Sequence, residues 1–429
     1  MHELSQMIKD DMKPALGVTE PGAIAFAVAK ARSFTKGDIK KVNVAMNSGM
    51  YKNAFTCGIP NSNKVGNMFA AALGVVAGNA DKGLESLADV TPEDNVKAQE
   101  MIDQGKITVE LSGITSRIFI EATVETEEDK AIVTIRDSHT NITKIIVNDK
   151  VELETEDEKK TEEDGGEEES HSIHKYTLQQ LYDYVTTVDI EEIRFINEAY
   201  KVNLELFHEG LENPRTTFAR QLLAINNGKE VSDDEQKTAS LMCNAAIEAR
   251  VIGLDKPAMS ITGSGAHGII ATMPLYAAYK VNGYTEEQLL RATALSYLVC
   301  MYIKEYSGRL SAFCGCAIAA GSGMACALVY LRGGTVEMMA HTLNNMASSI
   351  TGMICDGGNQ GCTMKGVAAV DAAYKSVEFA MNGIYISEVH GINGNTPEET
   401  MRNMGLIASP GMVGTEKTIV EIFEDKLKK

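Results

Sequence analysis

The spacing of apolar side chains divides the chain into a strand-rich part and a helix-rich part. Residues 1–35 have a helical period. Between residues 40 and 149 the period alternates or runs β-branched, in KKVNVAMN, KITVEL, SRIFIEATVE, KAIVTIRD and NITKIIVND, with helical patterns at 64–78 and 94–104. From residue 176 the period is helical almost to the end. The pattern predicts an α+β fold: an N-terminal helix and a mainly antiparallel sheet, followed by a mostly α-helical domain.

These changes of period also give the expected domain boundaries. We expect residues 1–35 to form a helical segment that packs on the C-terminal domain. Residues 36–151 would form an α+β domain and residues 173–429 an all-α domain. Between them, residues 152–172 would form an acidic loop or linker, because residues 152–169 hold 11 Asp or Glu against two Lys. Such a segment cannot bury enough apolar surface to order itself.

Charge and hydropathy exclude several classes of partner. The net charge of −19 argues against nucleic acid and anionic membrane, since both reward clustered Lys and Arg. The N-terminus, MHELSQMIKDDMKP, has no apolar signal segment. The 22 uncharged residues between Arg309 and Arg332 are long enough to span a bilayer, but they are rich in Gly, Ala, Ser and Cys. We therefore predict a buried helix there, and a cytoplasmic protein with no membrane or nucleic-acid partner.

Two local patterns indicate where a pocket would lie. In LGVTEPGAIAFAVAKA, Thr19 can cap a helix, Glu20 favours its first turn and Pro21 is tolerated only there. The backbone N–H groups of such a helix can bind an anion, although an ordinary capped helix is the alternative. Glycine-rich breaks at 261–268, 306–315, 332–335 and 355–366 interrupt the helical domain, and glycine lets backbone approach a ligand closely.

The cysteines are distributed unevenly. Five of the eight fall within 49 residues: Cys314, Cys316, Cys326, Cys355 and Cys362. No CxxC pair of a structural zinc site is present, and the spacing of bacterial ferredoxins is absent. One thiolate near position 314 and the two of ICDGGNQGC would leave one iron of a [4Fe–4S] cluster open, so that it acts as a Lewis acid. Buried structural cysteines are the alternative.

Several blocks then identify a family. They are KPALGVTEP, MYKNAF, AAALGVVAGNADKGLE, DSHTNI, MSITGSGAHGIIATMP, GRLSAFCG and GMICDGGNQGCTMK. In these blocks the chain resembles the L-cysteine desulfidase (UPF0597) family, which is related to the α chain of iron–sulfur L-serine dehydratases. The resemblance implies a [4Fe–4S] enzyme that eliminates sulfide from L-cysteine, giving pyruvate and ammonia through an aminoacrylate. It also implies the cluster ligands Cys314, Cys355 and Cys362, with Cys316 as a spare core thiol.

The chain departs from the family at three places. Val18 stands where many members have a cysteine, His267 stands where others often have Gln, and the C-terminus FEDKLKK has no cysteine. The departure at Val18 leaves open a dehydratase acting on L-serine, L-threonine or another β-substituted acid. A non-catalytic iron–sulfur sensor and a pyridoxal enzyme are further alternatives, although no basic helix or helix-turn-helix pattern supports the sensor.

The reaction assigns roles to residues of the matching blocks. The α-proton needs a base, for which His139 is the first candidate, with Glu20 and His267 as alternatives. Glu20 could instead bind the α-ammonium group. The candidate substrate-binding residues supply hydroxyl, amide, backbone or cationic donors: Thr19, Lys52, Asn53, Thr140, Ser264, Gly265, His267, Arg309 and Lys365. We expect a small amino-acid substrate and a homodimer.

Overall fold

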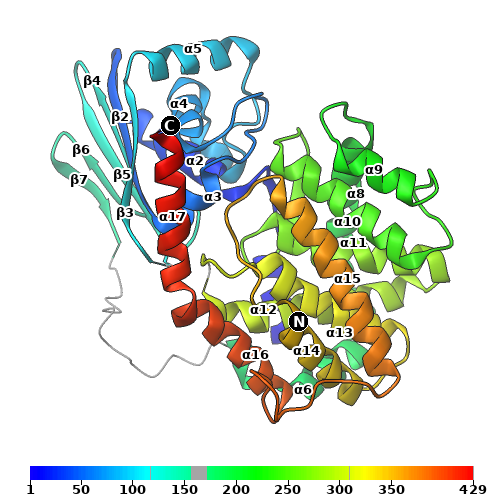
Figure 1. Cartoon of the computed structure of the whole chain (residues 1–429). Helices are drawn as coiled ribbons and strands as arrows, with labels where there is room; N and C mark the ends of the chain where they lie inside the picture. The colour runs from blue at the N-terminus through cyan, green and yellow to red at the C-terminus, as the bar shows by residue number, and fades with distance from the viewer. Residues whose placement is uncertain (116, 156–171, 309, 429) are drawn as a thin grey trace.

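The structure is a computed structural model that describes residues 1–115, 117–155, 172–308 and 310–428. A mixed sheet with its covering helices forms one part of the molecule, and a set of packed helices forms the other (Figure 1). The predicted α+β fold is confirmed. Most of the predicted acidic linker, residues 156–171, lies outside the described residues.

The large sheet has six strands in the order β3-β2-β4-β5-β6-β7. They are β2 (Ile39–Asn47), β3 (Ile107–Gly113), β4 (Phe119–Thr126), β5 (Lys130–Arg136), β6 (Ile142–Val147) and β7 (Lys150–Glu154). Among these strands β2 and β3 pair in parallel, and the other neighbours pair antiparallel. Alternate residues form one buried face, since Val44, Ala122 and Val133 lie opposite one another across three strands. The mainly antiparallel sheet predicted from the period is therefore confirmed.

The N-terminal segment crosses from the helical part to the sheet. Helix α1 (Glu3–Asp11) packs on α12, and β1 (Lys13–Leu16) pairs antiparallel with β8 (Pro257–Ser260). Helix α2 (Thr19–Arg32) then packs on β4 and β5, and beside it α4 (Asn67–Ala77) packs on β2 and β3. The turn between β1 and α2 is thereby fixed at the junction of the two parts.

Helices α3 (Ser48–Ala54) and α5 (Pro92–Asp103) complete the sheet-containing part. The helical part comprises α6 (Leu178–Thr187), α7 (Ile190–Ile193), α8 (Asn197–Glu212), α9 (Phe218–Ile225), α10 (Glu235–Val251), α11 (Gly265–Asn282), α12 (Glu286–Ser307), α13 (Gly321–Leu331), α14 (Val336–Ile350), α15 (Gly361–Met381) and α16 (Pro397–Leu406). The last helix, α17 (Val413–Leu427), returns to contact α3 (Figure 1). The helical period predicted from residue 176 onward is confirmed, with β8 as a short interruption.

The uncharged stretch after position 309 is buried, as predicted. It forms the π-helix η4 (Cys316–Ala320) followed by α13, and both are packed inside the helical part. Over the described ranges, no helix is long and apolar enough to cross a membrane. The glycine-rich segments before α11, η4 and α15 all end at the junction with the sheet, where the turn before α2 also lies.

Candidate functional site

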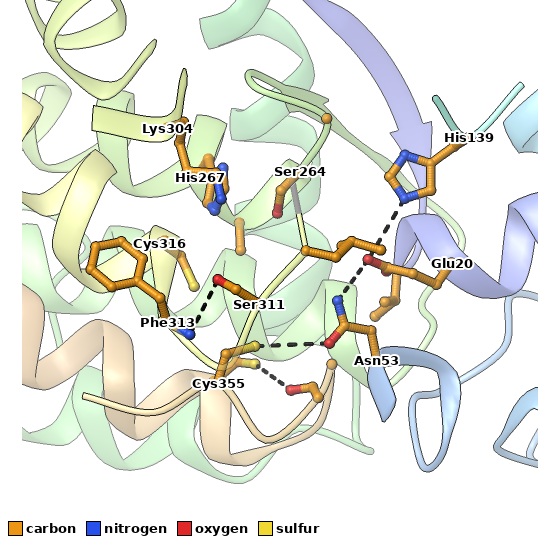
Figure 2. Close-up of a pocket in the computed structure, with 18 of the residues that line it drawn as sticks. Glu20, Asn53, His139, Ser264, His267, Lys304, Ser311, Phe313, Cys316 and Cys355 are labelled. Atoms are coloured by element: carbon orange, nitrogen blue, oxygen red, sulfur yellow. Dashed lines mark hydrogen bonds and ion pairs between the residues drawn. The ribbon is translucent and has the colours of Figure 1, made fainter. Parts of the chain in front are cut away.

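A cavity of about 600 Å³, including its opening to solvent, lies at this junction. Its described lining comes from the start of α2, from α3, from the turn between β5 and β6, from α10 and α12, and from the three glycine-rich segments. Figure 2 shows polar side chains of these segments pointing toward one another, with sulfur atoms on one side and His139 on the other. The lining of the cavity therefore brings together residues that are far apart in the sequence, since Cys355 lies close to Asn53, 302 positions before it.

The structure brings many of the predicted site residues together, but not all. The predicted residues that line the cavity are Glu20, Asn53, His139, Ser264, His267, Cys355 and Cys362. The predicted residues that the structure describes elsewhere than in this lining are Thr19, Lys52, Thr140, Gly265, Lys365 and Cys314. Arg309 lies outside the described residues.

A chain of polar contacts runs from the sheet to the thiols. The ring of His139 lies in the turn after β5, with Nε2 3.8 Å from Oε1 of Glu20. The amide of Asn53 donates to the same Glu20 oxygen at 2.9 Å. The thiol of Cys355 in turn donates to Oδ1 of Asn53 at 3.8 Å, and Figure 2 shows the three contacts in sequence.

The charge of this network is set by Glu20. Burial alone would raise the pKa of Glu20, but the nearby His139 ring and the Asn53 amide outweigh it and lower that pKa to about 2. Nε2 of His139 is buried and has no hydrogen-bond partner among the described residues. Glu20 is therefore an anion at neutral pH, which makes it a poor proton acceptor, and Nε2 of His139 lies beside it without a hydrogen bond to any described residue.

Three thiols line the other side of the cavity: those of Cys316, Cys355 and Cys362. The Cys314 thiol, the predicted ligand, is buried behind them, with its sulfur 3.5 Å from that of Cys316. The hydrogen bond from Cys314 lowers the pKa of Cys316 to about 6 against the effect of burial, and the charges of Lys365 and Arg250 act in the same direction. Cys316 is therefore disposed to ionise toward the cavity.

The donors on this side of the cavity are thiols, which are the usual protein ligands of iron–sulfur clusters. Within the described ranges, no three His, Cys, Asp or Glu side chains are close enough to hold one ion together. In a cluster each thiolate binds a different iron, so the thiolates stand farther apart than the ligands of one ion do. Asp356 of the loop pairs with Lys365 of α15, and the Cys362 thiol donates to the Gly357 carbonyl at 3.4 Å.

Two buried cations line the cavity in addition to the predicted residues. Arg250 on α10 is 4% exposed, and its Nε has no hydrogen-bond partner among the described residues. Lys304 on α12 donates to the Gly308 carbonyl at 2.8 Å. Burial and these two positive charges lower the pKa of His267 well below its usual value, so its ring is neutral at physiological pH.

The start of α11 faces the same cations. Ser264 is its N-cap residue and makes no side-chain capping bond, which leaves the hydroxyl and the first backbone N–H groups directed at the cavity. Thr262, held at φ 52°, places its hydroxyl 2.5 Å from Nδ1 of His267 and so fixes that ring. A carboxylate would find both a helix N-terminus and a guanidinium here.

The remaining predicted cations are committed to other partners. Lys52 is 1% exposed, and its ammonium donates to Glu416 at 2.8 Å and to the Ser311 carbonyl at 2.9 Å. Lys365 forms an ion pair with Asp356.

Thr19 is the first residue of α2, whose N-cap is Val18, and its hydroxyl donates to the Gly263 carbonyl at 3.3 Å. Thr19 is therefore a helix residue rather than the predicted cap, and Val18 itself lines the cavity.

Comparison with known proteins places these residues in context. Residues 81–421 match the model of the serine dehydratase alpha chain. A UPF0597 protein of Clostridium botulinum (strain Hall) is 40% identical over 424 residues, covering 98% of each chain. UPF0597 proteins of Caldanaerobacter subterraneus and Bacteroides fragilis are 36% and 34% identical, each covering 99% of this chain and 98% of the relative.

Proposed function

The chain belongs to the serine dehydratase alpha chain family, whose members are enzymes of the dehydratase or lyase type, and from this premise we propose that it is a carbon–sulfur lyase. In this proposal a [4Fe–4S] cluster is held in the cavity, and the reaction is β-elimination from L-cysteine to sulfide, pyruvate and ammonia. The observation that carries the proposal is the convergence on one cavity of three thiols, a buried histidine nitrogen without a hydrogen bond in the described part of the chain, and a buried arginine.

The cluster ligands would be three thiolates. Cys355 and Cys362 are two of them, since both line the cavity from one glycine-rich loop. For the third, the sequence favours Cys314, whereas the lining of the cavity favours Cys316. When bound, the cluster supplies an open iron that lowers the basicity of the leaving group.

The protein residues would hold the substrate by its charged groups. The N-terminus of α11, the Ser264 hydroxyl and the Arg250 guanidinium provide donors for the α-carboxylate. The Glu20 carboxylate, ionised at neutral pH, faces the α-ammonium group. These contacts would orient the β-carbon toward the thiol side of the cavity, because His139 and the cysteines lie on opposite sides (Figure 2).

His139 is the base in this proposal. Its Nε2 removes the α-proton of the substrate, and the ionised Glu20 3.8 Å away stabilises the imidazolium that forms. The electron pair of the broken C–H bond forms the double bond of aminoacrylate, while the C–S bond breaks and its electron pair leaves with sulfur as sulfide. Aminoacrylate then tautomerises to the imine, which water hydrolyses to pyruvate and ammonia.

L-Serine is the second candidate substrate, and one residue favours it. Val18, at the start of α2, lines the cavity at the position where the resemblance implies a cysteine in many members, and its methyl groups lie against Gly358 of the cysteine loop. An apolar side chain at this position provides no thiol to accept or pass on sulfur. A dehydratase that releases water from L-serine would need none.

Anaerobic purification followed by iron and sulfide quantitation tests the cofactor, and a substrate screen tests the reaction. We expect near-stoichiometric iron and sulfide, a broad absorbance that dithionite bleaches, and pyruvate and sulfide released together from L-cysteine. Pyruvate from L-serine at higher kcat/KM than from L-cysteine would support the second candidate. Protein without iron after anaerobic purification and reconstitution would contradict both.

Four single cysteine variants test the ligand set. Cys355→Ala and Cys362→Ala are expected to lose the cluster absorbance and most of the bound iron. Comparing Cys314→Ala with Cys316→Ala identifies the third ligand, because only the ligand variant should alter the iron content and the electron paramagnetic resonance of the reduced protein. Cys326→Ala is the matched control, since Cys326 is a buried thiol of α13 that does not line the cavity. Full iron content in Cys355→Ala would contradict the assignment of the loop.

A further inference from the structure

A second cavity of about 880 Å³, including its opening to solvent, lies beside the catalytic one. It is enclosed by the residues that follow β3, by the segment 310–312 and by the start of α17. Polar and apolar groups share its walls, and Ile114, Leu310, Met412 and Val413 are among the apolar lining side chains. The space is suited to a small molecule with an alkyl body.

A residue of this lining carries a buried polar atom that has no hydrogen-bond partner among the described residues. Glu416 is 4% exposed and lines the second cavity. Its Oε2 accepts a hydrogen bond from the Lys52 ammonium at 2.8 Å, whereas its Oε1 is buried and has no hydrogen-bond partner among the described residues. A buried carboxylate oxygen without a donor is costly, and native structures rarely leave one so. The atom therefore indicates a ligand that brings a donor.

The charge around the cavity selects the kind of donor. Among the residues that the structure describes, those lining this cavity include no Lys, Arg or His, so a ligand carboxylate would find no cation. The Lys52 ammonium is engaged by Glu416 and by the Ser311 carbonyl. The chain as a whole has a net charge of −19, which attracts cations. A protonated amine satisfies Glu416 with the stronger, charge-assisted type of hydrogen bond.

We propose that the second cavity binds a small primary amine, whose ammonium group donates to Oε1 of Glu416 and whose alkyl body packs between Leu310 and Met412. This site is separate from the proposed catalytic reaction and does not depend on it.

The two cavities share a wall. Leu310 and Ser311 line both of them, and the Lys52 that pairs with Glu416 is followed by Asn53, which donates to Glu20 in the catalytic cavity. Two adjacent residues of α3 thus link the two sites: Lys52 contacts Glu416, and Asn53 contacts Glu20. The same amine is therefore placed to influence the catalytic cavity.

Thermal unfolding with simple probes tests the site. The full-length, anaerobically purified protein is titrated with n-butylamine hydrochloride, n-butanol and sodium butyrate at matched ionic strength and pH. We expect a saturable rise of Tm with n-butylamine, a smaller effect of n-butanol and no saturable effect of butyrate, because a ligand that binds the native state raises its stability by mass action. Absence of a saturable rise with n-butylamine, or an equal rise with butyrate or butanol, would overturn the proposal.

A matched pair of variants on α17 locates the binding. Val413 lines the cavity and is 48% exposed, whereas Ile422 lies outside the described lining and is 51% exposed. Val413→Lys should weaken n-butylamine binding at least tenfold, because its ammonium repels the ligand and competes for Glu416. Ile422→Lys adds the same charge to the same helix and should bind as the unmodified protein does. Equal affinity in the two variants would show that the amine binds elsewhere and would overturn the assignment.

Discussion

The carboxylate of Glu20 is the residue on which the charge of the catalytic cavity depends. Its pKa in the folded protein, about 2, lies below its usual value of 4.5, because the His139 ring and the Asn53 amide outweigh burial. The folded state therefore binds fewer protons there than the unfolded state does. Its stabilising effect is fully present above pH 4.5 and is lost as the pH falls toward 2.

Replacing Glu20 by Gln should remove this pH dependence. Urea unfolding of both proteins from neutral pH to pH 2 should give a difference in unfolding free energy that shrinks as the pH falls below 4.5. The pH-dependent part should be at most about 3.5 kcal/mol, since the pKa falls from 4.5 to about 2 and one pKa unit corresponds to about 1.4 kcal/mol. If the two pH profiles run parallel, Glu20 has no depressed pKa in the folded protein.

His139→Gln tests the proposed base. The substitution should lower kcat by about 10²–10⁴-fold, which is the usual contribution of a positioned base. Tm and iron content should stay close to those of the unmodified protein. Thr140→Val is the matched control, because Thr140 is the exposed next residue and does not line the cavity. Unchanged activity in His139→Gln would leave His267 as the candidate base.

At this scale the sequence identifies some residues of the site and hides others. Glu20 and His139 stand in distinctive blocks beside glycine, proline or turns, so their position can be read from the chain. Arg250 and Lys304 lie inside helices α10 and α12, where a buried cation and an exposed one have the same local sequence. Cys314 and Cys316 differ only in their place around Gly315, and the packing of that turn decides which thiol faces the cavity.

At the scale of the elements, the contact between α10 and α11 is close enough to be tested with one methyl group. A Cβ at Gly265, the first residue of α11, would lie 2.6 Å from Nε of Arg250 and 2.8 Å from the Ala258 side chain. Gly265→Ala should therefore displace the guanidinium, raise KM more than it lowers kcat and destabilise the protein by about 1–3 kcal/mol. Steady-state kinetics and urea unfolding measure the two effects.

Gly414→Ala is the control for that substitution. Gly414 lies near the start of α17, and a Cβ there would meet nothing within 4 Å. Alanine in a helix is favoured over glycine by about 0.5–1 kcal/mol, so this variant should be as stable as the unmodified protein or more so. Unchanged KM in Gly265→Ala would contradict the role of Arg250 in holding the substrate.

A second prediction concerns helix α9, whose start is held by a carboxylate from α10. Glu248 is buried and accepts hydrogen bonds from the backbone N–H groups of Thr217, Phe218 and Ala219 at 2.8, 3.1 and 2.8 Å. Glu248→Ala would leave these donors without a partner and should cost about 2–3 kcal/mol in urea unfolding. The exposed Glu337 of α14 is the control, and its replacement should change stability by less than about 0.5 kcal/mol.

Most of the elements could be predicted from their hydrophobic period, and the exceptions share a cause. Strand β7 (Lys150–Glu154) is exposed throughout, so its sequence has no buried face to mark it. Residues 152–154 of this strand therefore fall within the linker that the acidic composition predicts. Strand β8 is four residues long and forms because β1 pairs with it. The parallel pairing of β2 with β3 depends on the path of the chain through α3, α4 and α5, which local sequence does not specify.

At the scale of the whole molecule, contacts between distant segments hold the two parts together at the cavity. Strand β1 pairs with β8, so the start of the chain crosses the junction just before α2. From the other end, α17 contacts α3 through the ion pair of Lys52 and Glu416 and through the stacked rings of Phe55 and Phe423, 4.6 Å apart. The cavity residues Asn53 and Val18 are positioned by these two crossings.

The Lys52–Glu416 pair allows this arrangement to be tested. Both side chains are nearly fully buried, and burial of Lys52 would by itself lower its pKa, but the charges of Cys355 and Glu416 raise it, so the ammonium stays charged. Removing one partner leaves the other charge buried without compensation, so Lys52→Met should destabilise the protein by about 3–5 kcal/mol. Adding Glu416→Leu should restore much of that loss, because two apolar side chains of similar volume can replace a buried pair.

Urea unfolding of the two single variants, the double variant and the unmodified protein gives the coupling energy directly. Residues 52 and 416 come from opposite ends of the sequence, so a large coupling would mean that the last helix is part of the framework of the catalytic cavity. The double variant should then also recover iron content and KM, since Asn53 regains its place next to Glu20. If the losses of the single variants simply add in the double variant, the pair does not act as a unit, and α17 is held by its aromatic contacts instead.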